Sequence, residues 1–407
     1  MLLTLNAGSS SLKFALYGVE AGELAALAAG RVDGLGGRAR FFVRAASGEE
    51  AQEPLEQEAD CDHHDALGAI MAWLGRAHGD RLLVAVGHRV VHGGAEHMRP
   101  AVIDAALLAD LRRLEPLAPL HQPHNLDGVE AAMRAFPGAV QVACFDTAFH
   151  RTHPFVADTF ALPRRYYDEG VRRYGFHGLS YEFIARRLRA VAPVQAVGRV
   201  IIAHLGNGAS LCALRDGKSV ASTMGFTALD GMPMGTRCGQ LDPGVVLYLM
   251  AEKGMSAQAI TDLLYNESGL KGMSGLSHDM RVLEASGSDG ARDAIAYFVA
   301  RLRREIGGLA ATIGGLDAIV FTGGIGENAV IIREAALSNL AWMGVALDAA
   351  ANARGAQVIS AQDSPVTVFV LATDEERMIA EHTAELLELI GAAKRGKPNA
   401  QAEGAAA

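Results

Sequence analysis

Three ionisable side chains follow short apolar runs, at positions where phosphate or metal chemistry could take place. They are Arg89 after Leu82–Val86, Asp146 after Val140–Phe145, and Glu375 after Val366–Ala372. If these runs are parallel strands, the three residues gather beyond the carboxyl ends of a sheet, where α/β proteins bind ligands. The guanidinium of arginine suits a carboxylate or phosphate, and acidic oxygens suit Mg²⁺. Helix caps and surface ion pairs use the same positions, so position alone leaves both interpretations open.

Three turns of small residues could approach a phosphate closely, namely Asn6–Ser11, Gly206–Ser210 and Gly323–Asn328. Backbone N–H groups in such turns are not shielded by large side chains. One turn is weak evidence, but three at strand ends indicate a bound nucleotide. A P-loop is excluded, because the sequence Gly-Lys-Ser at 217–219 has Cys212 where that motif requires its first glycine. The stretch from Gly323 also lacks the full G-x-G-x-x-G spacing of a dinucleotide fold.

The 14 histidines include two close pairs, His121 with His124 and His150 with His153. Neither pair has the H-E-x-x-H pattern or a nearby cysteine pair, so we predict no zinc site. A single histidine such as His177 is more often structural than catalytic.

The elements that must position these residues alternate between strand-like and helix-like patterns, which predicts an α/β fold. Further strands are expected at Val200–Ala203 and Ile319–Thr322. Helices are expected at Asp62–His78, Asp104–Leu114, Ser180–Val191, Arg292–Ile313 and Glu375–Leu389. Asp104 and Ser180 are the predicted N-caps of their helices.

Two stretches of the chain resemble one another. LLTLNAGSSSLKFAL begins at Leu2 and VIIAHLGNGASLCAL begins at Val200, and each reads as a β-hairpin around a turn of Asn, Gly and Ser. The second continues into Asp216-Gly217, a strong hairpin turn signal. We interpret the pair as an internal duplication that gives two domains. The expected first domain is 1–149 with the returning helix 378–390, the second is 150–377, and 391–407 is a flexible tail.

The composition excludes several classes of protein. The chain has 407 residues and a net charge of -9, without a run of Lys and Arg that would bind nucleic acid. Four scattered cysteines without a CxxC pair are typical of a reducing compartment, so a cytoplasmic location is expected. The short apolar start lacks the basic region of a signal peptide, and no apolar run reaches 18 residues, so no membrane association is expected.

Ten segments, in order, resemble the acetate kinase family from Leu2 to about Leu389. They are LNAGSSSLKF at Leu5, GHRVVHGG at Gly87, LAPLHQPHNL at Leu117, FDTAFH at Phe145, YGFHG at Tyr174, HLGNGAS at His204, MGTRCG at Met234, SHDMR at Ser277, FTGGIGEN at Phe321 and TDEE at Thr373. The resemblance implies two duplicated ribonuclease H-like α/β domains, as in actin and the sugar kinases, with a nucleotide cleft between them. It also implies reversible phosphoryl transfer from ATP to acetate, and a homodimer.

The resemblance further implies roles for individual residues. Asn6 and Glu375 would hold Mg²⁺ (or Mn²⁺), with Asp146 nearby. Nucleotide contacts would come from Lys13, His204, Leu205, Gly206, Asn207, Gly208, Asp279, Met280, Arg281, Gly324, Ile325, Gly326, Glu327 and Asn328. The catalytic set would be Arg89, His121, Asp146, His177 and Arg237, and the acid pocket would be Arg89, Val91, Leu120, Phe176 and Ala228. A carboxylate acceptor is already ionised at neutral pH, since its pKa is near that of a glutamate, about 4.3, so we expect Asp146 to orient Mg²⁺ and not to move a proton.

Three departures from the family pattern bear on these expectations. Ala228 stands where a pocket-lining proline is usual, which makes a longer acid such as propionate or butyrate an alternative substrate. Gly178-Leu179-Ser180-Tyr181 stands where G-T-S-H is usual, and Asp374 stands where asparagine is common. An ATP-driven conformational module without kinase activity is a further alternative, but no segment is left over to form a peptide-binding domain.

Overall fold

The computed structural model describes residues 1–8, 11–20, 22–54, 61–79, 81–119 and 121–389. The first sheet has the strand order β5-β4-β3-β2-β1-β6-β8-β7. Its strands are β1 (Leu2–Ala7), β2 (Ser11–Glu20), β3 (Glu23–Asp33), β4 (Arg40–Ala45), β5 (Glu50–Pro54), β6 (Ala85–Val90), β7 (Ala101–Val102) and β8 (Val140–Phe145). The second sheet has the order β11-β10-β9-β12-β13. Its strands are β9 (Arg199–Leu205), β10 (Ala209–Arg215), β11 (Lys218–Ser222), β12 (Ala318–Thr322) and β13 (Thr367–Val370).

The two sheets share one strand pattern. In each, the first strand pairs antiparallel with the strand that follows it in the chain and parallel with a later strand, as β1 does with β2 and β6, and β9 with β10 and β12. The order β3-β2-β1-β6-β8 in the first sheet therefore repeats as β11-β10-β9-β12-β13 in the second. This repeat matches the predicted duplication, and Asp216 and Gly217 both have positive φ at the hairpin turn between β10 and β11.

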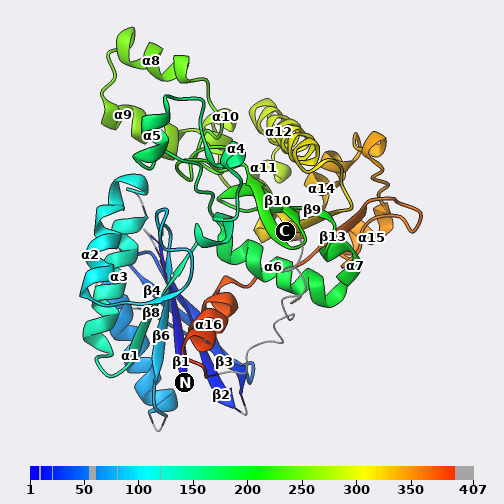
Figure 1. The fold of residues 1–407 in the computed structure, drawn as a ribbon. Helices are drawn as coiled ribbons and strands as arrows, with labels where there is room; N and C mark the ends of the chain where they lie inside the picture. The colour runs from blue at the N-terminus through cyan, green and yellow to red at the C-terminus, as the bar shows by residue number, and fades with distance from the viewer. Residues whose placement is uncertain (9–10, 21, 55–60, 80, 120, 390–407) are drawn as a thin grey trace, which may run out of the picture.

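The longer helices are α1 (His63–His78), α2 (Ala105–Arg113), α3 (Gln122–Ala135), α6 (Gly178–Val191), α8 (Pro243–Ala251), α12 (Asp289–Ile313), α14 (Val330–Leu337) and α16 (Glu375–Leu386). The shorter ones are α4 (Phe155–Asp158), α5 (Arg164–Asp168), α7 (Pro193–Ala196), α9 (Ala257–Asp262), α10 (Gly269–Ser274), α11 (Met280–Ala285), α13 (Gly323–Asn328) and α15 (Ala349–Ala353). Figure 1 shows α1, α2 and α3 on one side of the first sheet and α16 on the other. No helix in the described part of the chain is both long and apolar enough to cross a membrane.

Helix α16 joins the two halves of the molecule. It packs on β1 and β6 of the first sheet and against α6, which adjoins the second. Met378 and Ile379 on this helix are fully buried. Gly87 in β6 permits the close approach, because a Cβ at this position would lie 2.7 Å from Cγ2 of Ile379. The C-terminal helix thus contacts the sheet that the N-terminus starts.

Several predicted boundaries are wrong. Strand β6 runs through Gly87 to Val90, so Arg89 lies within the strand, opposite Cys144 of β8, and not beyond its end. Helix α6 begins at Gly178 with His177 as its N-cap, so Ser180 is an interior residue and not a cap. The predicted turn at Gly323–Asn328 is the short helix α13. The predicted N-cap Asp104 is confirmed, since its side chain accepts a hydrogen bond from the N–H of Leu107.

Candidate active site

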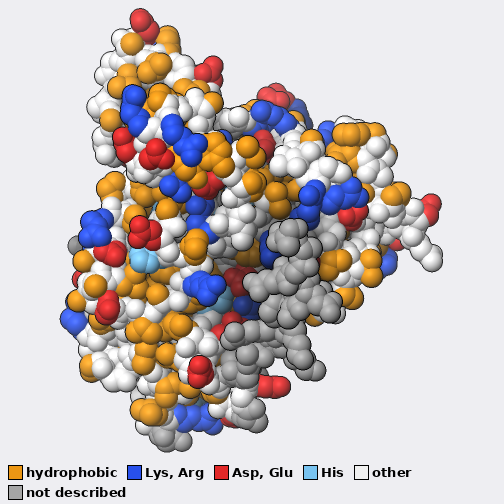
Figure 2. Space-filling model, viewed as in Figure 1, with side chains coloured by type: hydrophobic (Ala, Val, Ile, Leu, Met, Phe, Trp, Pro, Cys, Tyr) orange, Lys and Arg blue, Asp and Glu red, His pale blue; other side chains and the backbone are white. Residues whose placement is uncertain are grey.

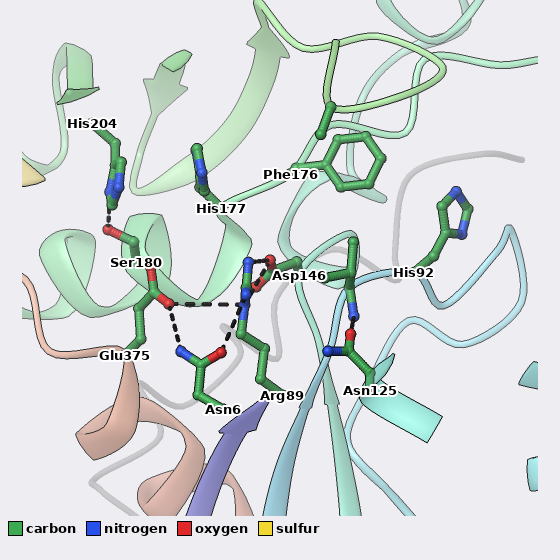
Figure 3. A network of polar contacts seen from close by, with 12 residues as sticks. Asn6, Arg89, His92, Asn125, Asp146, Phe176, His177, Ser180, His204 and Glu375 are labelled. Carbon is green, nitrogen blue, oxygen red and sulfur yellow. Dashed lines mark hydrogen bonds and ion pairs between the residues drawn. The ribbon is translucent and has the colours of Figure 1, made fainter. Parts of the chain in front are cut away.

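Four residues from four separate parts of the chain form a polar network at the carboxyl ends of neighbouring strands of the first sheet (Figure 3). Arg89 donates to Oδ2 of Asp146 from Nε at 3.0 Å and from Nη2 at 2.5 Å. It also donates from Nη1 to Oδ1 of Asn6 at 3.2 Å, and its Nε lies 3.8 Å from Oε2 of Glu375. The amide of Asn6 in turn donates to Glu375 at 3.5 Å. β1, β6 and β8 present these side chains beside the first turn of α16.

Asp146 is the most deeply buried member of the network. The side chain is fully buried, and Oδ1 has no hydrogen-bond partner among the described residues. Burial raises the pKa of the carboxyl, and the charge of Glu375 raises it further, against the opposing effect of Arg89. An ionised carboxylate here therefore gains from an additional positive partner.

The donor set fits a hard cation. Asp146, Glu375 and Asn6 supply two carboxylates and one amide oxygen, which are the ligands that Mg²⁺ takes in proteins. The partnerless Oδ1 of Asp146 is an orphaned acceptor in the same place. Among the described residues no group of three His, Cys, Asp or Glu side chains could hold a metal. A cation would therefore share its oxygens between carboxylates and the amide.

His177 is held in a left-handed backbone conformation, with φ 58° and ψ 25°, at the start of α6. A residue other than glycine seldom adopts this backbone conformation, and where one does, the surrounding contacts enforce it. Here the N–H of Gly178 donates to the carbonyl of Asp146 at 2.9 Å, which ties the helix start to the end of β8. The imidazole stacks on that of His204, with ring centroids 4.3 Å apart. Burial lowers the pKa of His177 well below its usual value, and His204, Arg89 and Arg237 lower it further, so the ring is neutral.

Arg237 is a cation without an anion. Its Nη1 donates to the carbonyl of Ala228 at 2.9 Å and lies 3.5 Å from the sulfur of Met234, and no carboxylate of the described residues pairs with it. Burial lowers the pKa of the guanidinium, and Arg89 acts in the same direction. Partly buried charges are normally paired, so this one indicates an anionic ligand.

Gly208 lies between Arg237 and His177. A Cβ at this position would lie 3.2 Å from Nε2 of His177 and 3.9 Å from Nη2 of Arg237. The absence of a side chain therefore leaves room beside both groups. Gly235, in the loop that carries Arg237, donates its N–H to the carbonyl of Asn207 at 3.1 Å and joins that loop to the HLGNG turn.

Three of the residues predicted for the acid pocket share one apolar cluster with Met234, which Arg237 contacts. Val91 and Phe176 are buried in one hydrophobic cluster, and Ala228 packs against it partly exposed. Leu120 lies outside the described residues. Burial and the charges of Arg237 and Arg89 lower the pKa of His121 to about 3, so this predicted catalytic residue is a neutral group beside both arginines.

A cavity lies next to the HLGNG turn, which supplies two of its lining residues. This cavity of 890 Å³ is lined by Gly206, Asn207, His278, Asp279, Met280, Arg281, Glu284, Gly324, Ile325, Asn328 and Ala329. Eight of the predicted nucleotide contacts are in this set, namely Gly206, Asn207, Asp279, Met280, Arg281, Gly324, Ile325 and Asn328.

The other predicted nucleotide contacts do not line this cavity. Leu205 and Gly326 are buried, and His204 and Gly208 face His177. Glu327 accepts hydrogen bonds from the N–H groups of Gly323 and Thr373, at 2.9 Å and 3.2 Å, and so ties α13 to the TDEE segment. Lys13 is exposed on β2 and lines a separate cavity of 1020 Å³ with Asp374 and Glu376.

Several supporting residues had no predicted role. Asn125 on α3 accepts the N–H of Val91 at 2.9 Å and donates to the carbonyl of Ala7 at 2.6 Å (Figure 3). Gln122 accepts the N–H of His92 at 3.1 Å. Both lie in the LAPLHQPHNL segment, in which no local pattern indicates these contacts of the amide side chains.

His150 supports the loop that carries Phe176 and His177. Its Nε2 lies 2.9 Å from the carbonyl of Phe176, so this nitrogen carries a proton and donates. Its Nδ1 then accepts from Oγ of Ser219, 2.8 Å away, and Ser219 accepts from Nε2 of His153 at 2.7 Å. His150 and His153, the second close pair of histidines, thus form with Ser219 a hydrogen-bonded chain that holds the loop of Phe176 and His177.

Between the two similar sheets, the HLGNG turn, Arg89, Arg237 and the oxygens of Asp146 and Glu375 thus lie near one another. Figure 2 shows charged and histidine side chains gathered in this region. This combination defines a phosphotransferase with the fold of actin and the sugar kinases, because catalysis of phosphoryl transfer is mainly positioning and charge stabilisation.

Comparisons with known proteins identify the family. A model of the acetokinase family matches residues 1–381. Acetate kinase of Methylocella silvestris is 60% identical over 400 residues, covering 96% of this chain and 99% of the relative. The crystal structure of Porphyromonas gingivalis acetate kinase is similar with a TM-score of 0.84 and 37% identity, covering 95% and 99% of the two chains. That of a propionate kinase from Francisella tularensis has a TM-score of 0.87 and 36% identity, covering 94% and 98%. The chain belongs to the acetokinase family.

Proposed function

We propose that this protein transfers a phosphoryl group reversibly between ATP and acetate, giving acetyl phosphate and ADP. The observation that carries the proposal is the partly buried Arg237, which has no carboxylate partner among the described residues. It faces His177 across Gly208 and adjoins the apolar cluster of Val91 and Phe176. An acid with a small apolar group and a carboxylate fits these surroundings. The neighbouring cavity of 890 Å³ would take the nucleotide.

The proposed roles follow from charge and position. A phosphoryl group in transfer carries negative charge on three oxygens, which preorganised donors stabilise. Arg89 and Arg237 supply two positive groups and His177 supplies a neutral donor. The acceptor carboxylate is already ionised, so no residue needs to remove a proton, and Asp146 acts by orienting Arg89 and a cation. His121 lies beside both arginines without adding charge.

Asn6 and Glu375 would hold the divalent ion, Mg²⁺ or Mn²⁺, with Asp146 beside them. When bound, the ion neutralises charge on the phosphate oxygens. The chain's own contribution is to keep these oxygens together at the ends of β1 and β8 and at the start of α16.

The proposed domains are 1–149 with 378–390, and 150–377. The first sheet and α16 from Met378 onward belong to the former, and the second sheet and the first turn of α16 belong to the latter. Because Arg89 and Asp146 come from one domain and His177 and Arg237 from the other, closure of the two domains would complete the site.

A longer acid is a second candidate substrate. Ala228 is a small residue beside the guanidinium of Arg237, and a similar solved structure is that of a propionate kinase. One methylene in an apolar pocket changes discrimination by about 1–3 kcal/mol, so overlap between acetate and propionate is expected.

The test is a comparison of kcat/KM for acetate, propionate and butyrate with saturating ATP and Mg²⁺. Acetate should be preferred, with propionate within about 100-fold. A preference for butyrate would instead indicate that the protein is a butyrate kinase of the same family. ATP hydrolysis that no carboxylate alters would instead support the conformational module.

We also propose that the protein is a cytoplasmic homodimer. The cysteines Cys61, Cys144, Cys212 and Cys238 are all free thiols, as in a reducing compartment. Helix α8 has no buried residue and exposes Leu247 (65%), Tyr248 (51%) and Met250 (50%). It lies on the lobe that projects at the top of Figure 1. A second copy of the same surface is the proposed partner, because isologous contacts are the usual way in which homodimers cover such a face.

Light scattering on the wild-type protein and on Leu247→Glu tests the dimer. The wild type should have the mass of two chains and the variant that of one. A wild-type monomer, or a variant that stays dimeric, would contradict the proposed surface.

A further inference from the structure

A buried chain of hydroxyl groups ends on His177. Nδ1 of His177 lies 2.8 Å from Oγ of Ser210, and this oxygen lies 2.5 Å from the phenolic oxygen of Tyr181. Ser210 and Tyr181 are both completely buried. Tyr181 is one turn along α6 from His177, while Ser210 comes from β10, so the chain crosses from a helix to the second sheet.

The number of hydroxyl hydrogens decides which group donates in each hydrogen bond of this chain. The phenol of Tyr181 has one hydrogen, and Ser210 is its only hydrogen-bond partner in the described part of the structure. Burial raises the pKa of Tyr181 well above its usual value, so the phenol keeps this hydrogen. The tyrosine therefore donates to Ser210, and the serine directs its own hydrogen at Nδ1 of His177. A reversed chain leaves the buried phenolic hydrogen without an acceptor, and a serine that accepts from both neighbours leaves its own hydrogen without one among the described residues. Either arrangement is disfavoured by roughly 10-fold or more.

We propose that Ser210 and Tyr181 are positioning residues that fix the neutral imidazole of His177 in the tautomer with its proton on Nε2. This nitrogen faces the space beside Gly208, because a Cβ built on that glycine would lie 3.2 Å from it. Arg237 borders the same space, with Nη2 3.9 Å from the same point. The Nε2–H group is therefore aimed where a phosphate oxygen would lie.

In these surroundings the tautomer of His177 decides which ring nitrogen donates a hydrogen bond. His177 is neutral, since burial and neighbouring positive groups lower its pKa. A neutral imidazole has one donor and one acceptor nitrogen, and the acceptor would repel a phosphate oxygen. Stacking on His204 fixes the plane of the ring, and His204 is itself held by Ser180, whose Oγ lies 2.8 Å from its Nδ1. A hydrogen bond from Ser210 to Nδ1 therefore favours the tautomer in which Nε2 carries the proton and donates.

The role of His177 as a donor rests on the proposed function, but its tautomer does not. The tautomer can be measured in the protein alone by ¹⁵N–¹H correlation spectra of protein labelled at histidine, with His177 assigned from the spectrum of His177→Asn. The proton should be on Nε2 in the wild type, and Ser210→Ala should give a mixture of tautomers. A wild-type proton on Nδ1 would overturn the inference, whether or not the protein is a kinase.

Kinetics provide the second arm of the test. Ser210→Ala should lower kcat by roughly 10-fold with KM for acetate nearly unchanged, because the hydroxyl acts on a transition-state donor and not on the acid pocket. Tyr181→Phe, which keeps the ring, should lower kcat less, and Ser210→Thr, which keeps the hydroxyl, should recover activity. Ser222→Ala is the matched control, since the Ser222 hydroxyl on β11 is buried without a partner. Wild-type kcat in Ser210→Ala would overturn the positioning role.

Discussion

Arg89 binds Asp146 through one carboxylate oxygen only. Both Nε and Nη2 donate to Oδ2, at 3.0 Å and 2.5 Å, and Oδ1 is left buried without a partner among the described residues. The guanidinium of Arg89 therefore balances the negative charge of Asp146 but occupies only one of the two carboxylate oxygens. The remaining oxygen is available to a cation, and Nη1 of Arg89 donates to Asn6, the proposed ligand from β1.

Arg89→Ala should lose both activity and stability. Turnover should fall by about 100-fold or more, as for the loss of a preorganised charged donor. The free energy of unfolding should fall by about 3–5 kcal/mol, because Asp146 and Glu375 would share a buried site without their counter-charge. Steady-state kinetics and denaturant unfolding measure the two effects. Arg112→Ala is the control, since its partly exposed ion pairs should contribute about 1 kcal/mol or less. Normal turnover in Arg89→Ala would place the acid site elsewhere.

Arg237→Ala should separate activity from stability. Turnover should again fall by about 100-fold or more, with a raised KM for the acid. Stability should be unchanged or slightly higher, because the substitution removes a partly buried charge that has no ionic partner. The same two assays apply, and the contrast with Arg89→Ala is the informative result. If Arg237→Ala were as destabilised as Arg89→Ala, the side chain would have a structural partner that this account lacks.

Ala228→Pro should increase the preference for acetate over propionate. The carbonyl of Ala228 accepts the hydrogen bond from Arg237 and is retained by proline. The larger ring fills space beside the cluster of Val91 and Phe176, which should disfavour propionate relative to acetate by about 1–3 kcal/mol. The measurement is the ratio of kcat/KM for the two acids in the wild type and the variant. An unchanged ratio would show that Ala228 does not border the acid.

The contact between α6 and α16 should make stability depend on pH. Nε2 of His382 lies 3.0 Å from Oε2 of Glu182. Burial would lower the pKa of His382, but the charge of Glu182 outweighs it and the pKa rises to about 10. Burial likewise opposes ionisation of Glu182, but His382 and Arg186 bring its pKa down to about 2. Arg186 also pairs with Glu381 and Glu385, and Cys144 adjoins His382.

The directions of these two pKa shifts define the pH range in which the ion pair stabilises the fold. The contribution of His382 is complete below its unfolded pKa of 6.5 and is lost as the pH rises through about 10. That of Glu182 is complete above 4.5 and is lost as the pH falls through about 2. His382→Gln should therefore cost about 3 kcal/mol at pH 6, and the difference from wild type should shrink towards pH 10. Unfolding free energies at both pH values test this, with the exposed pair Arg189 and Asp216 as control through Arg189→Ala. A difference that does not vary with pH would contradict the assignment.

The sequence predicts the architecture well because the evidence for it is local. The repeated Asn-Gly-Ser hairpins and the apolar runs indicate two similar sheets, and the strand order confirms them. The end of β6 was misplaced because His88 looks like a turn residue. In the structure His88 is buried, and its Nε2 lies 2.7 Å from Oε1 of Gln141, so pairing with β1 and β8 outweighs its polarity.

The supporting residues of the site could not be predicted because their partners are distant in the sequence. Ser180 was interpreted as a helix cap, whereas the left-handed conformation of His177 starts the helix earlier and turns Ser180 towards His204. Ser210 is 33 residues from His177, and no local pattern links them. The family resemblance named His177, and the hydrogen bonds of the folded chain supply the physical reason for its orientation.

The most direct measurement is acyl hydroxamate formation from ATP, Mg²⁺ and acetate in the presence of hydroxylamine, with wild type and Arg237→Ala side by side. Hydroxylamine traps an acyl phosphate, so the product reports transfer to the carboxylate and not hydrolysis of ATP. The account predicts acetyl hydroxamate from the wild type that depends on acetate, and about 100-fold less from Arg237→Ala. ATP consumption without hydroxamate from any short acid, or equal yields from both proteins, would contradict it.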